Sequence, residues 1–157
     1  MRREHFFVFA TLCLLVVGMT SVSSAGLPGW MKFGRGEEKS ITWLHDLKEA
    51  QKVSSQTRKP MLVTFGASWC TFCKKMDETT LSEPKMVEFV TENFVPVHLD
   101  FDKNREVAKI LEVETLPTMV VLSPQADLLG KIIGFKKSDE LKDELNAAKK
   151  NQSVVGR

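Results

Sequence analysis

The sequence contains no tyrosine and only three cysteines, and each shortage excludes a class of protein. Without tyrosine there is no tyrosine-based catalysis, and three cysteines are too few for a small fold held together by disulfides. A net charge of +2 gives no electrostatic basis for binding nucleic acid. No apolar run reaches the ~18–20 residues of a membrane-spanning helix. The 157 residues, 43% hydrophobic and 27% charged, instead have the composition of one ordinary globular domain.

Residues 1–25 have the pattern of a secretory signal peptide. Two arginines precede an apolar run of 12 residues (FFVFATLCLLVV), and a Ser-Ser-Ala sequence ending at Ala25 places small residues where a signal peptidase cleaves. A retained anchor is the alternative, but such a run rises only ~18 Å as a helix, short of the ~30 Å hydrocarbon core. The sequence therefore predicts an exported protein, periplasmic or secreted, that begins at Gly26 and has no stable membrane insertion.

Cleavage would remove Cys13 and leave Cys70 and Cys73 as the cysteines of the mature chain. They are separated by Thr71 and Phe72, which is too short a spacing to tie distant segments of a fold together. An exported protein also sits where disulfides can form. The pair is therefore better interpreted as reactive than as structural.

Residues 26–40 hold four of the nine glycines and are interpreted as a linker. Hydrophobic periodicity then indicates a domain (41–151), which a short tail (152–157) follows. The expected elements are an edge strand at 41–43, a helix at 47–57, a strand at 61–65, a helix at 70–79, a helix capped by Ser82, a strand at 94–101, a helix marked by Val107, Ile110 and Leu111, strands at 118–122 and 128–133, and a helix capped by Ser138. Because strands alternate with helices and a hairpin follows, the expected fold class is α/β, with a central mixed sheet and helices on both faces.

Cys70 follows a buried strand and opens a helix. A cysteine at a helix N-terminus faces unpaired N–H groups and the positive end of the helix dipole, which favours its thiolate. Cys73 lies one turn further along, so it can close onto Cys70 or resolve a mixed disulfide. Cys70 is the expected nucleophile, the more acidic and more exposed thiol, and Cys73 is the expected resolving thiol.

Two further features extend the motif. Trp69 precedes the first cysteine, and Leu116-Pro117-Thr118 opens a later strand. With them, residues 41–150 resemble the thioredoxin superfamily, and most of all exported thioredoxin-like domains such as the C-terminal domain of the membrane thiol-disulfide interchange protein.

The resemblance implies a thioredoxin-like fold and thiol–disulfide exchange with protein substrates, more in the reducing direction. It also implies a cis bond before Pro117 and a substrate groove shaped by Pro117 and the backbone of Leu116. Trp69, Thr71 and Phe72 would border that groove. The expected partners are protein thiols and disulfides and an upstream electron donor; no cofactor is needed, and the protein is expected to be a monomer.

Two positions depart from the thioredoxin pattern. That family has a buried aspartate six residues before the first cysteine, where this chain has Thr64, and a lysine 19 residues before the cis-proline, where it has His98. A buried carboxylate would accept the proton of the second cysteine, which Thr64 cannot do. His98 could assist in that transfer, or it could be a polar residue at a strand edge.

Other functions stay open. A zinc site usually needs four ligands, and this chain has no second Cys-x-x-Cys pair; the mature histidines are His45 and His98. Copper(I) favours thiolates and thioethers, and Met76 lies nearby, but no metal site is expected. The alternatives are a disulfide oxidase or isomerase, and a metal-binding or assembly module that uses the same groove.

Overall fold

The computed structural model describes residues 40–155. The expected signal peptide lies outside these residues, as does the expected linker up to residue 39. No helix in the described range combines the length and hydropathy that a membrane span requires. In chain order the elements are α1 (Leu47–Thr57), β1 (Met61–Gly66), α2 (Thr71–Thr79), α3 (Pro84–Asn93), β2 (Val95–Asp100), α4 (Arg105–Ile110), β3 (Thr118–Leu122), β4 (Leu128–Ile133) and α5 (Ser138–Val155).

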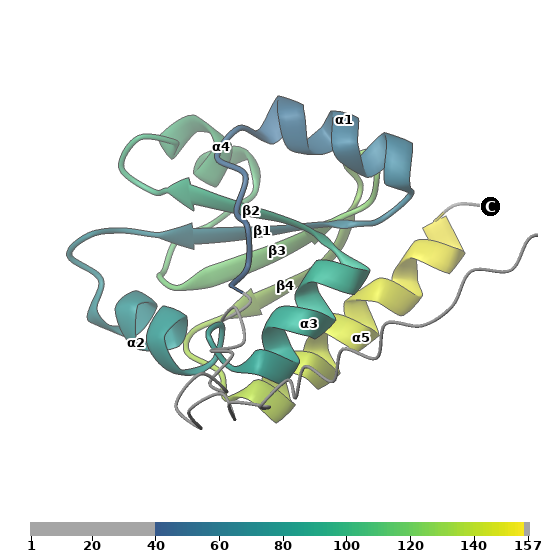
Figure 1. Ribbon diagram of the computed structural model, residues 1–157. Helices are drawn as coiled ribbons and strands as arrows, with labels where there is room; N and C mark the ends of the chain where they lie inside the picture. Colours follow the sequence, from purple (N-terminus) through teal and green to yellow (C-terminus); the bar gives the residue numbers. More distant parts are fainter. Residues whose placement is uncertain (1–39, 156–157) are drawn as a thin grey trace, which may run out of the picture. The chain divides into compact units, whose positions relative to one another are not determined.

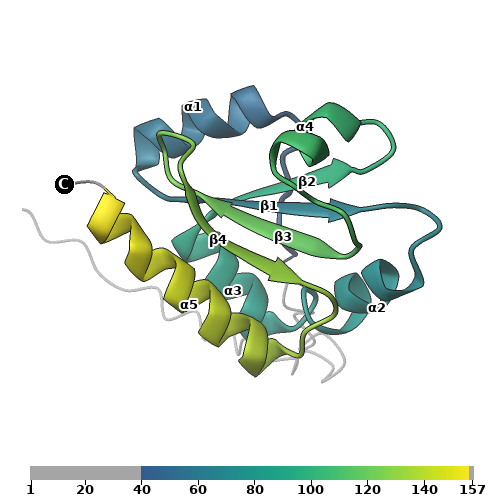
Figure 2. The same ribbon diagram turned by 180° about the vertical axis from the view of Figure 1, so that it is seen from behind.

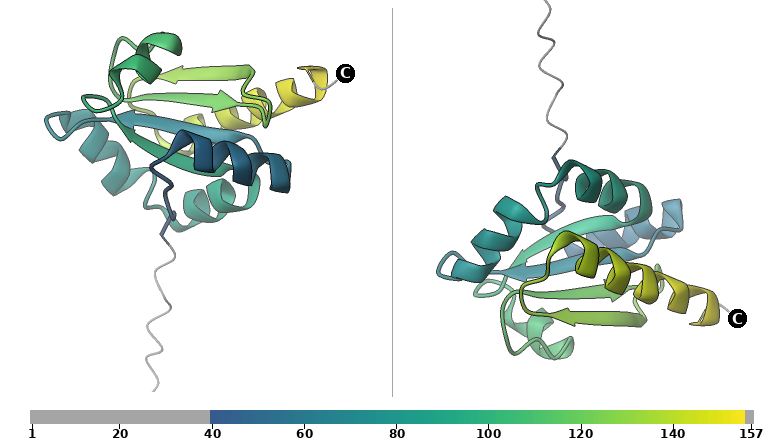
Figure 3. Two further views of the ribbon diagram at one scale, coloured as in Figure 1. Left: turned by 90° about the horizontal axis from the view of Figure 1, so that it is seen from above. Right: turned by 90° about the horizontal axis from the view of Figure 1, so that it is seen from below.

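The strands form one mixed sheet in the order β2-β1-β3-β4. β1 runs parallel to β2 and antiparallel to β3, and β3 and β4 form an antiparallel hairpin. Helices α1 and α4 cover one face of the sheet, and α2, α3 and α5 cover the other (Figures 1 and 2). Figure 3 shows α3 and α5 together beneath the sheet. The predicted α/β class and layering are confirmed.

Two apolar cores lie on either side of the sheet. β1 contributes to both, because Leu62 packs against α2, α3 and α5 while Met61, Val63 and Phe65 pack against α1 and α4. This division follows from the alternation of side chains along a strand. A strand buried on both faces is a rigid base for the loop that follows it, so β1 fixes the position of the cysteine pair.

Helix α5 approaches the sheet closely at Gly130 in β4. A Cβ atom on Gly130 would lie 2.8 Å from the Cβ atom of Ala148, closer than real side chains come. The missing side chain therefore allows α5 to pack directly on the hairpin. Leu141 and Leu145 of α5 are both fully buried in the core on this face of the sheet.

The expected edge strand at 41–43 is wrong. One residue further on, Leu44 forms an isolated parallel bridge to Val97, through hydrogen bonds to the backbone of Pro96 and His98. Three residues of alternating polarity provide too few ladder bonds for a strand. As expected for a residue without an N–H, Pro96 lies near the start of its strand, at the edge of the sheet.

The two predicted serine caps are also wrong. The N-cap of α3 is Glu83, because Pro84 occupies the first turn, and the hydroxyl of Ser82 donates to the carbonyl of Glu78 in the preceding helix. Ser138 is the first residue of α5, and its hydroxyl donates to the carboxylate of Glu83. Both hydroxyls therefore donate hydrogen bonds to a neighbouring element and do not cap their own helices.

α5 continues to Val155, beyond residue 151, where the sequence predicts the end of the domain. In α4, Ile110 is 78% exposed and does not belong to the buried stripe of its helix.

Candidate active site

The loop after β1 delivers Cys70 to the first turn of α2. Cys70 is the N-cap residue, and its Sγ accepts a hydrogen bond from the backbone N–H of Cys73 at 3.1 Å. The backbone N–H of Cys70 donates to the carbonyl of Ala67, which closes the turn. The sulfur thus takes the place of the side-chain oxygen that usually caps a helix, where N–H groups and the helix dipole favour negative charge.

Cys70 and Cys73 form a disulfide, with their Cα atoms 5.3 Å apart. Both residues are 6% exposed. The two cysteines are therefore equally buried in the disulfide form, and the expectation that Cys70 is the more exposed thiol concerns the reduced pair. The side chains beside the disulfide are exposed to solvent. Trp69 is 63% exposed, Phe72 is 59% exposed, and Thr71, between the cysteines, is also exposed.

Pro117 and the cysteine loop lie at the same end of the central strands. Phe65, near the end of β1, pairs with Thr118, at the start of β3, so the residues that follow β1 and precede β3 are neighbours. The Leu116–Pro117 bond is cis, as the resemblance implied. The carbonyl of Pro117 accepts a hydrogen bond from Gly134. In the described part of the chain, the backbone N–H and C=O groups of Leu116 have no hydrogen-bond partner.

Trp69 is held by a residue that the sequence analysis did not identify. Its indole Nε1–H donates to Asp102 at 2.7 Å, and Asp102 also forms an ion pair with Arg105 at 2.6 Å. The hydrogen bond from Trp69 and the guanidinium of Arg105 lower the pKa of Asp102. These contacts fix the orientation of the exposed indole beside Cys70.

Thr64 and His98 lie opposite each other on β1 and β2. Thr64 is buried, and its hydroxyl is a buried polar atom without a hydrogen-bond partner. His98 is partly buried, and desolvation of its ring lowers its pKa below the usual 6.5, with Asp77 opposing the shift. The structure therefore places no titratable group at position 64, while a histidine lies next to it.

A cavity of about 220 Å³ opens between the cysteine loop, α2 and β2. Its lining residues are Gly66, Ala67, Ser68, Cys73, Lys74, Asp77, His98 and Asp100. Asp77 was missed by the sequence analysis. Partial desolvation raises its pKa, against the lowering effect of His98. The signal that could have found it is its position one helical turn after Cys73, on the same side of α2.

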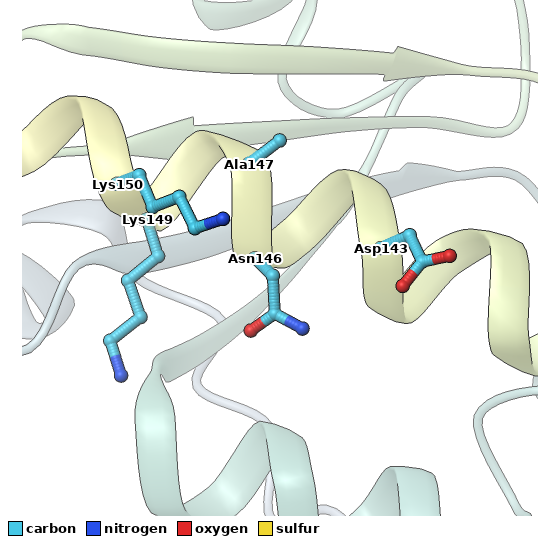
Figure 4. Close-up of a pocket in the computed structure, with 5 residues that line it drawn as sticks. All are labelled: Asp143, Asn146, Ala147, Lys149 and Lys150. Carbon is cyan, nitrogen blue, oxygen red and sulfur yellow. The ribbon is translucent and has the colours of Figure 1, made fainter.

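A larger depression of about 610 Å³ lies along the exposed side of α5 (Figure 4). It is lined by Asp143, Asn146, Ala147, Lys149 and Lys150, all from one helix. It shares no residue with the cavity beside Cys73 and contains no thiol or imidazole. Across residues 40–155, no cluster of three or more histidine, cysteine, aspartate or glutamate side chains is arranged to hold a metal ion.

Replacing Thr64 by valine is expected to stabilise the protein. Valine keeps the shape of threonine and removes the unpaired hydroxyl, so the free energy of unfolding should rise by about 1 kcal/mol. Thr118→Val is the matched control, because that buried hydroxyl donates to the carbonyl of Thr115 at 2.7 Å, and its loss should destabilise by about 1 kcal/mol. Denaturant unfolding of both variants measures the difference. Equal losses of stability in the two would contradict this account of Thr64.

A protein with this sheet and this cysteine pair belongs to the class of thiol–disulfide oxidoreductases with a thioredoxin fold. Comparison with known families makes the assignment specific. The model of the thioredoxin-like domain family matches residues 47–149, and the chain belongs to that family. The predicted resemblance is confirmed.

The relatives include a thioredoxin and a thiol:disulfide interchange protein. Thioredoxin H2-1 of Oryza sativa subsp. japonica is 32% identical over 124 residues, which cover 75% of this chain and 83% of that protein. The thiol:disulfide interchange protein DsbD of Campylobacter jejuni is 26% identical over 106 residues, which cover 65% of this chain but only 18% of the relative. The oxidised C-terminal domain of DsbD from Neisseria meningitidis has a similar fold, with a TM-score of 0.57 and 24% identity over 67% of this chain and 97% of that domain.

Proposed function

We propose that this protein is an exported reductant that transfers electrons from its Cys70–Cys73 dithiol to disulfides of other exported proteins. The observation that carries the proposal is the cysteine pair at the N-terminus of α2, which lies at the same end of the central strands as Pro117. An upstream electron donor would then return the pair to its dithiol form.

The reaction follows from the positions of the two sulfurs. The Cys70 thiolate attacks one sulfur of the partner disulfide, and the other partner sulfur leaves as a thiolate. Cys73 then loses its proton and attacks Cys70 Sγ, which breaks the bond between Cys70 and the partner. The partner gains two electrons and ends as a dithiol, while the chain ends with the Cys70–Cys73 disulfide seen in the structure. One copy of the chain is joined to one partner, so a monomer suffices.

An extended segment of the partner is proposed to bind beside the disulfide. The backbone N–H and C=O groups of Leu116 have no partner in the described residues and can pair with such a segment as an added strand. Trp69, Thr71 and Phe72 provide exposed surface around the sulfurs. The contacts are mostly to backbone and to aromatic rings, so the site suits many sequences.

The reducing direction is favoured by the charges around the pair. The residues between the cysteines, Thr71 and Phe72, carry no positive charge that would stabilise the Cys70 thiolate. Asp77 and Asp100 place two carboxylates in the cavity beside Cys73, against one ammonium group, that of Lys74. This excess of negative charge disfavours a Cys73 thiolate, and a less stable reduced form makes a stronger reductant.

With a small dithiol as electron donor, the protein is expected to accelerate reduction of the disulfides of insulin well above the rate of the donor alone. Precipitation of the freed insulin chain follows the reaction. The opposite activity is measured in parallel, as reoxidation of a reduced, unfolded protein in a glutathione buffer. Faster reoxidation together with no insulin reduction would reject the proposed direction and favour an oxidase.

Export is proposed from the amino-terminal pattern described above. If the signal peptide is removed after Ala25, the mature protein begins at Gly26. The intact mass of the exported protein measures this directly. A mass that retains residues 1–25, and with them Cys13, would contradict the cleavage.

A further inference from the structure

Building on the exchange reaction proposed above, we propose that His98 is the general base that takes the proton of Cys73, and that Asp77 is the counter-charge that supports it. Thioredoxins place a carboxylate at the position of Thr64 for this task. Here the base would come from the neighbouring strand, and the charge from the helix that carries the cysteines.

The geometry at Gly66 brings the thiol and the imidazole together. A Cβ atom placed on Gly66 would lie 3.1 Å from His98 Nε2 and 3.7 Å from the Cβ atom of Cys73. The imidazole nitrogen and the cysteine side chain therefore flank the same point, which glycine leaves open. Both residues line the cavity of about 220 Å³, which has room for water.

Asp77, on α2, adds a carboxylate to the cavity that Cys73 and His98 line. It lies four residues after Cys73, so both side chains are on one side of the helix. Asp77 lines the same cavity as His98 while remaining exposed to solvent. It can therefore stabilise an imidazolium on His98 and still leave a route by which the proton reaches bulk water.

Within residues 40–155, His98 is the one imidazole that lines the cavity beside Cys73. Thr64 is buried next to His98 with an unpaired hydroxyl and cannot accept the proton at ordinary pH. The other charged groups lining the cavity are Lys74, which has no lone pair when protonated, and the carboxylates Asp77 and Asp100.

The electrostatics suit a base that works near neutral pH. Desolvation lowers the pKa of His98, Asp77 and Asp100 raise it, and His45 lowers it. His98 is consequently neutral at pH 7 and free to accept a proton. Asp77 in turn is influenced by His98 and by Glu78 on its own helix.

The proposed step acts after the mixed disulfide has formed. The Cys73 thiol gives its proton to His98 Nε2, and the Cys73 sulfur attacks Cys70 Sγ. The bond between Cys70 and the partner breaks, and the partner sulfur leaves with that electron pair. The proton on His98 then passes to water in the cavity, or to the departing thiolate.

The two steps can be separated with dithiobis(nitrobenzoate), a small disulfide that releases one coloured thiolate when Cys70 attacks and a second when Cys73 resolves the adduct. In stopped-flow experiments at pH 7, His98→Gln should slow the second release about a hundredfold. The first release should be unchanged. His45→Gln, which replaces the exposed histidine whose Nδ1 contacts the carbonyl of His98, is the matched control. It should leave the first rate unchanged and change the second only slightly, because His45 affects the pKa of His98 but does not accept the proton.

The pH profile distinguishes a base from a structural residue. In the wild-type protein the second release should slow as pH falls through the pKa of His98, below 6.5, because the imidazolium cannot accept a proton. In Asp77→Asn the inflection should move to lower pH, because the charge that raises this pKa is gone, whereas Glu78→Gln should have little effect. A wild-type rate and profile in His98→Gln, or an inflection that stays in place in Asp77→Asn, would overturn the assignment.

These outcomes are independent of the protein substrate. If the small disulfide gives the expected two phases but insulin is not reduced, the proposed reductant function fails and the assignment of His98 stands. If insulin is reduced and the second phase does not respond to His98 or Asp77, the function stands and the assignment of His98 fails.

Discussion

Replacing Cys70 by serine is expected to abolish disulfide reduction entirely, while replacing Cys73 by serine should convert the protein into a trap. Serine lacks a nucleophilic thiolate, so without Cys70 the reaction cannot begin. Without Cys73 the attack by Cys70 still occurs, but the mixed disulfide cannot be resolved from within the chain. Non-reducing electrophoresis of the exported proteins should therefore show covalent complexes with Cys73→Ser and none with Cys70→Ser.

The backbone N–H of Cys73 supports this order of events. It donates to Cys70 Sγ in the disulfide, and the same donor is available to a Cys70 thiolate when the pair is reduced. Serine at position 73 keeps that N–H, so Cys73→Ser changes resolution without removing the stabilisation of Cys70. Complexes that accumulate with Cys70→Ser instead would show that the roles of the two cysteines are reversed.

Replacing Phe65 by alanine is expected to produce the largest loss of stability, about 3–5 kcal/mol. Phe65 is completely buried in the core under α1 and α4, and it lies in β1 directly before the loop that carries Cys70. Since a domain of this size is stable by only about 5–15 kcal/mol, the variant would be close to unfolding at physiological temperature. Thermal unfolding measures the change.

Phe72→Ala provides the matched control, because it removes the same side chain from a position that is 59% exposed. Its effect on the free energy of unfolding should stay within about 0.5 kcal/mol. Similar losses for the two variants would contradict the assignment of Phe65 to the core that supports the site.

Local patterns predicted most of the fold and the sulfur chemistry. The run at 61–65 is apolar at nearly every position because β1 is covered on both faces, and the following turn and helix place Cys70 at an N-terminus. These features depend on neighbours in sequence, so a single chain reveals them. The cis bond before Pro117 came from the family resemblance and was confirmed.

The missed features depend on contacts between distant segments. Asp102 reaches Trp69 from the loop after β2, and the hydroxyl of Ser138 donates to Glu83 on another helix. In the sequence, Asp77 is indistinguishable from an ordinary surface residue of a helix. Its role becomes visible only in the structure, where the pairing of β1 with β2 places His98 in the cavity that Asp77 also lines. No periodicity in the sequence encodes such pairings.

The reduction potential of the Cys70–Cys73 pair tests the central claim most directly. It is measured by equilibrating the protein with glutathione buffers of known potential and counting the thiols that remain. A reductant of the thioredoxin type should give a value near about −270 mV. A value near about −120 mV, which belongs to strong disulfide oxidants, would contradict the account.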